Sequence, residues 1–208
     1  KKLFYLMGIV LLFSATLPSS TNYSTKLVTA KNNLRAAQGD SVMSSVLFNS
    51  MIDSIFPAWT GTNWGFNGTS NVPKQGEIAC GYFVSTTLKH VGFNLNRYKL
   101  AQQAASVVID VLCGKNKAYS TDKSALINKL KAKKGNRLYV VGLDYHVGFI
   151  AVQNNEVYFI HSDYFKNKVV KEFAFKSQGF SATNSYVYGE ITNNSSLLNK
   201  WKLKTKIY

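Results

Sequence analysis

Several residue types are scarce in this chain, and each scarcity narrows its chemistry. Its 208 residues include only 2 cysteines, 3 histidines and 3 prolines. Two cysteines allow at most one disulfide, so the chain is not a disulfide-rich scaffold. No internal repeat or low-complexity block is present, and 46% of the residues are hydrophobic, as in ordinary globular proteins. A chain of this length suits one domain with a sizeable core.

Acidic residues are also few. There are 10 of them against 25 lysines and arginines, which gives a formal net charge of +15. Such a balance favours anionic partners such as nucleic acid, acidic lipid or cell-wall polymer. The lysines are scattered, and the chain has no arginine-rich run and no aromatic-basic RNA motif, so we expect no nucleic-acid partner.

A short uncharged apolar run lies near the start of the sequence. Lys1 and Lys2 precede the apolar residues 3–13, and small and polar residues follow. This is the layout of a secretory signal, and the run is too short for an ordinary membrane-spanning helix. We therefore expect residues 1–20 to be a signal peptide and the protein to be exported to the periplasm, cell surface or medium. No stable membrane insertion is expected after cleavage.

The hydrophobic pattern changes from helical to extended along the chain. After residues 23–39, a linker or one short helix, helical spacing predicts helices over residues 40–56, 80–91, 100–112 and 120–134. Alternating β-branched and aromatic residues then predict strands over residues 138–143, 146–152, 157–161, 169–173, 186–191 and 200–208. Helices followed by an antiparallel sheet predict an α+β domain. We place an N-terminal helical segment at residues 21–57 and the main domain at 58–208.

Cys80 lies where a polar, glycine-bearing loop meets the helix predicted over residues 80–91. Free N–H groups and the helix dipole at such a position favour a thiolate, which is the nucleophilic form. Two other interpretations stay open. Cys80 is an inert packing residue, or it forms a disulfide with Cys113, which an oxidising compartment favours.

The histidines supply a candidate base. Asn154-Asn155 suits a two-residue turn with positive φ, which pairs Val152 with Val157. This register puts His161 diagonally across from His146 and Asp163 directly opposite it, on one sheet face. A cysteine nucleophile needs a base that a third polar group orients. Zinc is a poorer alternative because close-paired ligands are missing, so we expect no metal and no cofactor. His90, near the end of the Cys80 helix, is expected to be a surface residue or a partner of the helix C-terminal dipole.

These residues resemble a known family, the papain-like cysteine hydrolases and in particular the NlpC-type cell-wall peptidases. The resemblance spans residues 59–171 and rests on Asn63-Trp64-Gly65-Phe66, Ala79-Cys80-Gly81-Tyr82-Phe83-Val84, His146-Val147-Gly148-Phe149-Ile150 and Phe159-Ile160-His161-Ser162. It implies a papain-like fold for residues 58–208. It also implies Cys80 as nucleophile, His146 as base, His161 as orienting residue and peptide or peptidoglycan as substrate. Ala79 and Gly81-Tyr82 depart from the family pattern, as does the long helical stretch before His146.

Further site residues follow from this hypothesis. Gln75 lies where papain-like enzymes often place an oxyanion-hole donor, and its alternative is an ordinary loop residue. Asp144 and Asp163 are reserve candidates for orienting His146. Substrate contacts are expected from residues of the long loop before Cys80, although its tryptophans are alternatively anchors to the core: Trp59, Trp64, Phe66 and Asn67.

Three functions stay open at this point. The leading one is an exported cysteine hydrolase that cleaves an amide bond. The second is a secreted, non-catalytic binding module on the same fold, which a disulfide between Cys80 and Cys113 would favour. The third is an acyl or glutamyl transferase that uses the same thiolate with an amine acceptor.

Overall fold

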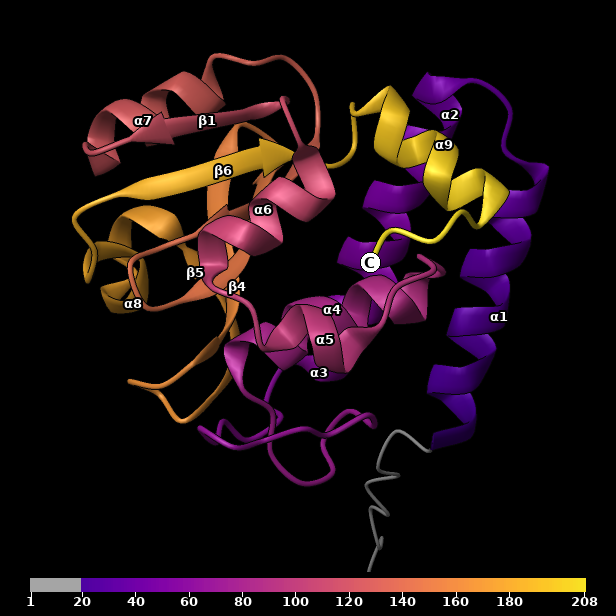
Figure 1. Cartoon of the computed structure of the whole chain (residues 1–208), viewed down its shortest axis with the longest axis horizontal. Coiled ribbons are helices and arrows are strands. Elements are labelled where there is room, and N and C mark those ends of the chain that lie inside the picture. The colour runs from indigo at the N-terminus through magenta and orange to yellow at the C-terminus, as the bar shows by residue number, and fades with distance from the viewer. Residues whose placement is uncertain (1–19) are drawn as a thin grey trace, which may run out of the picture.

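The computed structural model describes residues 20–208, with side chains from Tyr23 onward (Figure 1). Residues 1–19 of the predicted signal peptide lie outside the described residues, and its last residue, Ser20, begins α1. The helices are α1 (Ser20–Ala36), α2 (Asp40–Asn49), the π-helix η1 (Ser50–Ile55), α3 (Phe56–Trp59), α4 (Cys80–Val91), α5 (Arg97–Ala101), α6 (Ala105–Cys113), α7 (Lys123–Lys131), the 3-10 helix η2 (Ala174–Lys176), α8 (Gln178–Ser181) and α9 (Ser195–Leu203). From Ser20 onward, no helix is long and apolar enough to cross a membrane.

One antiparallel sheet organises the chain. Its strands are β1 (Lys117–Ser120), β2 (Arg137–Gly142), β3 (Val147–Gln153), β4 (Glu156–Asp163), β5 (Lys168–Phe173) and β6 (Tyr186–Glu190). Neighbouring strands lie in the order β1-β6-β2-β3-β4-β5. Helices combined with an antiparallel sheet confirm the predicted α+β class.

The hairpin of β3 and β4 has the predicted register. Val152 pairs with Val157, and the turn residues Asn154 and Asn155 have φ of 52° and 62°. Two consecutive positive φ values define a type I′ turn, which matches the right-handed twist of the strands and sets their pairing. The register therefore follows from the Asn-Asn pair that the sequence displays.

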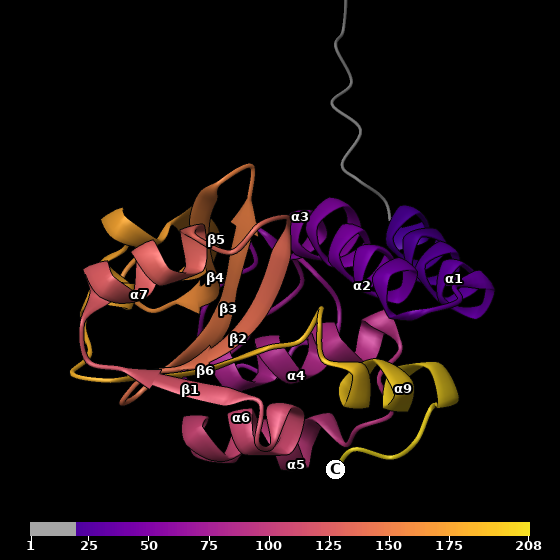
Figure 2. The same ribbon diagram turned by 90° about the horizontal axis from the view of Figure 1, so that it is seen from above.

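The sheet is covered on both faces, and alternate residues of each strand enter different cores. Figure 2 shows α7 on one side of the sheet and α4, with the N-terminal helices, on the other. Phe149, Ile160 and Val169 belong to the larger core beneath α4, whereas Ile150 and Phe159 belong to the smaller core beneath α7 and α8. Because successive side chains of a strand point to opposite faces of the sheet, His146 and His161 lie on the same face as Ile150 and Phe159, the face of the smaller core.

The end of the chain departs from the prediction. The strand expected over residues 200–208 is wrong, because α9 occupies Ser195–Leu203. Asn194 caps this helix through its side chain, and Leu197, Leu198 and Trp201 share a buried face at helical spacing. Trp201 also donates from Nε1 to the carbonyl of Val91, 3.0 Å away. Alternation of lysine with apolar residues was thus a weaker signal than helical spacing.

The N-terminal helix is held to the cysteine-bearing helix by a buried polar cluster. The Tyr23 hydroxyl accepts a hydrogen bond from Trp59 Nε1 at 2.9 Å and lies 2.8 Å from His90 Nδ1. Burial, with nearby cationic side chains, lowers the pKa of His90 to about 4. A neutral His90 that faces Tyr23 corrects the expectation of a surface residue, since α1 covers it.

Acid is expected to destabilise the fold through His90. Its pKa is about 4 in the folded chain against an ordinary 6.5, so the neutral form is favoured on folding. Well above pH 6.5, His90 is neutral in both the folded and the unfolded chain. As the pH falls from 6.5 to 4, the unfolded chain binds a proton that the folded chain excludes, and up to roughly 3 kcal/mol of stability is lost. Urea unfolding at pH 7.5 and 4.5 measures this loss. His90→Gln, which does not titrate, should lose less, and an equal loss in both proteins would contradict the assignment.

Candidate active site

Cys80 begins α4, as predicted, beside the start of β3. Ala79 precedes it in an extended conformation, and the face of α4 that packs on the sheet includes Phe83, Val84 and Leu88. A Cβ on Gly81 would lie 2.4 Å from the carbonyl oxygen of Ala101. Only glycine therefore lets α5 approach the first turn of α4, which explains one departure from the family pattern.

Cys80 is half-buried, and backbone N–H groups lie around its thiol. Burial raises the pKa of Cys80, and the backbone N–H groups of Val147, Gly81 and Cys80 itself act in the opposite direction. Burial outweighs the helix N-terminus, so the resting form is a thiol. This corrects the expectation of a thiolate stabilised by the helix alone. A nucleophilic Cys80 needs a base to take its proton.

His146 and His161 form a directly hydrogen-bonded pair. Nε2 of His146 lies 2.8 Å from Nδ1 of His161. His146 immediately precedes β3, and its neighbour Val147 is the residue whose N–H approaches the Cys80 sulfur. Burial, with a smaller electrostatic contribution from His161, lowers the pKa of His146 to about 3. His146 is thus neutral at rest, which is the form that accepts a proton.

One ring contact of His161 and one hydrogen bond of its neighbour Ser162 fix the position of His161. The ring of Phe159 stacks on that of His161 with centroids 4.0 Å apart. Ser162, the next residue, donates from Oγ to the carbonyl of Ile78 at 2.6 Å. That bond ties β4, beside His161, to the chain just before Cys80. The structure therefore brings the nucleophile's loop and both histidines together around the same ends of β3 and β4.

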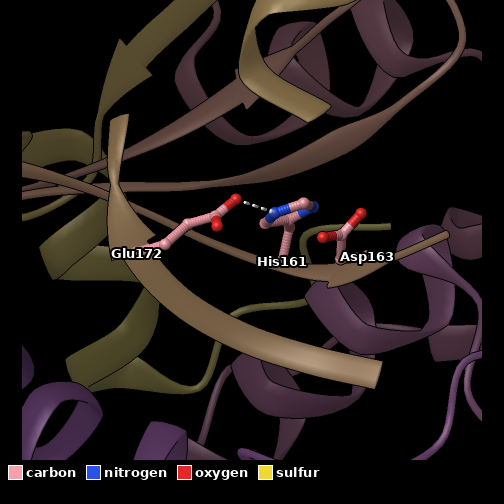
Figure 3. Close-up of side chains that lie close together, drawn as sticks. All are labelled: His161, Asp163 and Glu172. Carbon is pink, nitrogen blue, oxygen red and sulfur yellow. Dashed lines mark hydrogen bonds and ion pairs between the residues drawn. The ribbon is translucent and has the colours of Figure 1, made fainter. Parts of the chain in front are cut away.

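Glu172 is a site residue that the sequence analysis missed. Its Oε1 lies 3.2 Å from Nε2 of His161 (Figure 3). Its Oε2 pairs with Lys166. Glu172 comes from β5, where it pairs with Phe159. The predicted strand over residues 169–173 contained it, but nothing in residues 164–167 indicated the register of β5 on β4. Without that register no strand neighbour could be assigned to Glu172.

The same neighbourhood has the residue types of a metal site. One ligand atom each from His161, Asp163 and Glu172 lie within 4.8 Å of one another (Figure 3). However, both ring nitrogens of His161 are hydrogen-bonded, and Glu172 also bonds Lys166. Only Oδ2 of Asp163 is a buried oxygen of this group without a hydrogen-bond partner. The arrangement is a chain of hydrogen bonds from His146 through His161 to Glu172. A cation bound here would have to displace Lys166 and break one of the His161 hydrogen bonds.

The two reserve aspartates differ in their surroundings. Asp163 is fully buried, and its Oδ1 accepts the N–H of Phe165 at 2.9 Å. Asp144 is bound instead by the 183–185 loop: Asn184 N–H lies 2.8 Å from Oδ2 and Ser185 Oγ lies 2.8 Å from Oδ1. These bonds lower the pKa of Asp144. Asp144 therefore stabilises a surface loop. The group hydrogen-bonded to the His146 ring is His161.

The residues predicted to contact substrate or the oxyanion differ in burial: one lies in the core and the others lie at the surface. Trp59 is 0% exposed and packs against Phe83 and His90, so the expectation of a substrate contact is corrected to a core role. Phe66 is 82% exposed, and Asn67 and Gln75 are also at the surface. The side chain of Gln75 thus projects from the loop without being buried beside Cys80.

Trp64 connects this loop to His146 through the ring of Tyr164. Tyr164 was not among the predicted site residues. The ring of Trp64 lies 6.3 Å from that of Tyr164, which in turn lies 5.7 Å from His146. Backbone bonds fix the contact, since Trp64 N–H donates to the carbonyl of Asn167 at 3.0 Å. Tyr164 is 37% exposed and Trp64 is partly exposed, so both rings offer surface next to His146.

Arg97 anchors the far side of the same loop. This arginine is buried, and its guanidinium donates to the carbonyl of Thr69 at 2.8 Å and to Oγ1 of Thr86 in α4 at 2.7 Å. The loop of residues 60–79 is thus held at Trp64 by the backbone of Asn167 and at Thr69 by Arg97. A long loop that is rigidly placed beside a nucleophile suits substrate binding.

Gly179 offers a test of how closely His161 is packed. A Cβ at this position would lie 2.8 Å from Cε1 of His161. Gly179→Ala is therefore expected to displace the imidazole and to slow Cys80 chemistry by about tenfold to a hundredfold. The rate of Cys80 alkylation by iodoacetamide, followed by intact mass, measures this effect. Gln178→Ala on the exposed side of α8 is the matched control, and similar rates in the two variants would show that Gly179 does not constrain His161.

The two cysteines do not form a disulfide. Both are free, with Cys80 partly exposed and Cys113 buried against Gly189. Burial and nearby carboxylates raise the pKa of Cys113 to about 12, which makes it an inert packing residue.

Comparisons with known proteins add no identification. No protein-family model, curated protein or solved structure matches the chain.

Proposed function

We propose that this protein is an exported, papain-like cysteine hydrolase that cleaves an amide bond. The observation that carries the proposal is the placement of the Cys80 thiol against the N–H of Val147, while the adjacent His146 is held by His161 at 2.8 Å. Cys80 as nucleophile, His146 as base and His161 as orienting group would supply the three parts of a cysteine-hydrolase site.

The chemistry starts from a neutral pair. His146 accepts the Cys80 proton as the sulfur attacks the substrate carbonyl, and a tetrahedral oxyanion forms. The C–N bond then breaks, and the His146 imidazolium donates its proton to the leaving amine, which leaves a thioester on Cys80. A water molecule gives a proton to His146 and attacks the thioester, which releases a carboxylic acid and the Cys80 thiol. Backbone N–H groups at the start of α4 are the proposed oxyanion donors, because the exposed Gln75 does not lie beside Cys80.

The proposed substrate is a peptide of the bacterial cell wall. Three features support it: the motif resemblance to NlpC-type peptidases, the net charge of +15, and the partly exposed ring of Tyr164, which lies beside His146 and contacts the ring of Trp64. A basic protein is attracted to an anionic wall polymer, and aromatic rings supply contact area for an extended peptide. Export is part of the same proposal.

Purified peptidoglycan incubated with the protein tests this function. We expect mass spectrometry to detect new amine and carboxyl termini that Cys80→Ala protein does not produce. Products joined to an added amine would favour acyl transfer instead. Retention on peptidoglycan without any cleavage, equal in Cys80→Ala, would favour a binding module and overturn the hydrolase.

A further inference from the structure

We infer that Glu172 is a positioning residue that sets the tautomers of His161 and His146 and so leaves the lone pair of His146 on Nδ1. The inference deepens the proposed function, because the two histidines are its base and orienting group. It adds a fourth member, Glu172, to the Cys80, His146 and His161 set.

The geometry joins His146, His161 and Glu172 in one chain of hydrogen bonds, which is called the relay here. Nε2 of His146 meets Nδ1 of His161 at 2.8 Å, and Nε2 of His161 meets Oε1 of Glu172 at 3.2 Å. The second carboxylate oxygen of Glu172 pairs with Lys166. The side chain of His161 is 0% exposed and that of Glu172 is 12% exposed, so water competes little for these bonds.

The direction of each hydrogen bond follows from the charge of Glu172. Burial alone would raise the pKa of Glu172, but hydrogen bonds from His161, Lys166 and Ser177 outweigh it and hold the pKa at about 2. An ionised carboxylate only accepts hydrogen bonds, so Nε2 of His161 carries the proton.

The remaining protons are then determined. With His161 neutral, as the inference requires, its imidazole has one N–H and one lone pair, so Nδ1 of His161 is an acceptor. His146 must donate to it from Nε2, and its own lone pair lies on Nδ1. Nδ1 is the nitrogen nearer the His146 backbone, and the adjacent Val147 N–H is the group that approaches the Cys80 sulfur. With Nε2 of His146 committed to His161, Nδ1 is the ring atom left to accept the Cys80 proton.

Loss of the Glu172 carboxylate would remove this directionality. With no fixed acceptor at Nε2, His161 can carry its proton on Nδ1 and donate to Nε2 of His146. His146 then carries its own proton on Nδ1 and has no lone pair to offer the thiol. Asp163 does not replace Glu172, since the relay bonds of His161 go to His146 and Glu172.

Nitrogen-15 NMR of the histidine rings tests the inference without any substrate, and the chain has only 3 histidines to assign. At pH 7 we expect both His146 and His161 to be protonated on Nε2 and unprotonated on Nδ1. Glu172→Leu should shift or average the Nδ1 and Nε2 resonances of both rings. Glu172→Gln retains an acceptor oxygen and should keep the native pattern in part. His161 protonated on Nδ1 in the unaltered protein would overturn the inference, and this measurement does not depend on a variant folding.

Cys80 alkylation separates failure of the inference from failure of the proposed function. We expect Glu172→Leu to slow alkylation by iodoacetamide about tenfold to a hundredfold, the effect of losing a charged hydrogen bond to the relay. Glu172→Gln should recover part of the rate. The matched control is Glu156→Gln, since Glu156 is a β4 glutamate paired with Lys131. Equal rates in Glu172→Leu and the unaltered protein would overturn the positioning role. An unreactive Cys80 in the unaltered protein would instead contradict the hydrolase.

Discussion

His146→Ala is expected to slow amide hydrolysis by about a hundredfold to ten-thousandfold, the range for removing a general base. The effect should be large because burial raises the pKa of Cys80, so no thiolate is available at neutral pH without proton transfer. Alkylation of Cys80 by iodoacetamide at pH 7 should slow in the same direction, and it can be measured by intact mass before any substrate is known.

His90→Gln is the matched control for this experiment. His90 lies in the same helix as Cys80, but its ring bonds Tyr23. We therefore expect alkylation and hydrolysis rates close to those of the unaltered protein. If His146→Ala reacts as fast as His90→Gln, His146 is not the base for Cys80.

Trp59→Ala is expected to lower the free energy of unfolding by about 3–5 kcal/mol, as for other fully buried tryptophans. Trp59 is 0% exposed, and its Nε1 hydrogen bond to Tyr23 helps to hold α1 on the domain. Urea unfolding at neutral pH, followed by circular dichroism, measures the change.

Trp64→Ala is the natural comparison, because Trp64 lies in the loop that follows α3 and is partly exposed beside Tyr164. We expect it to change stability by less than about 1 kcal/mol. Its effect should appear in substrate binding, as a higher KM. Equal destabilisation by both substitutions would show that the two tryptophans do not divide into a core residue and a surface residue.

The most local features of the site were predictable from sequence. Helical spacing placed Cys80 at the start of a helix, and α4 begins at that residue. The Asn154-Asn155 pair predicted the hairpin register, because its positive φ values admit few turn types. That register brought His146 and His161 onto one face, where their rings meet. Each of these predictions depends on residues close together in the chain.

Features that depend on distant segments were missed or misjudged. Glu172 reaches His161 only because β5 pairs with β4 in one register, and the connecting residues carry no turn signal as clear as Asn-Asn. Trp59 is buried because α1, α3 and α4 meet around it, so a glycine-rich neighbourhood said nothing about its exposure.

The sequence by itself determined the α+β class, the helix that begins at Cys80 and the alignment of two histidines, because hydrophobic period and turn chemistry are local properties. Only the tertiary structure decided the electrostatics. Packing buries Cys80, which raises its pKa, and packing places Glu172 at the end of the His146–His161 pair. Desolvation and charge depend on everything that surrounds a group in space, and most of that surrounding comes from other parts of the chain.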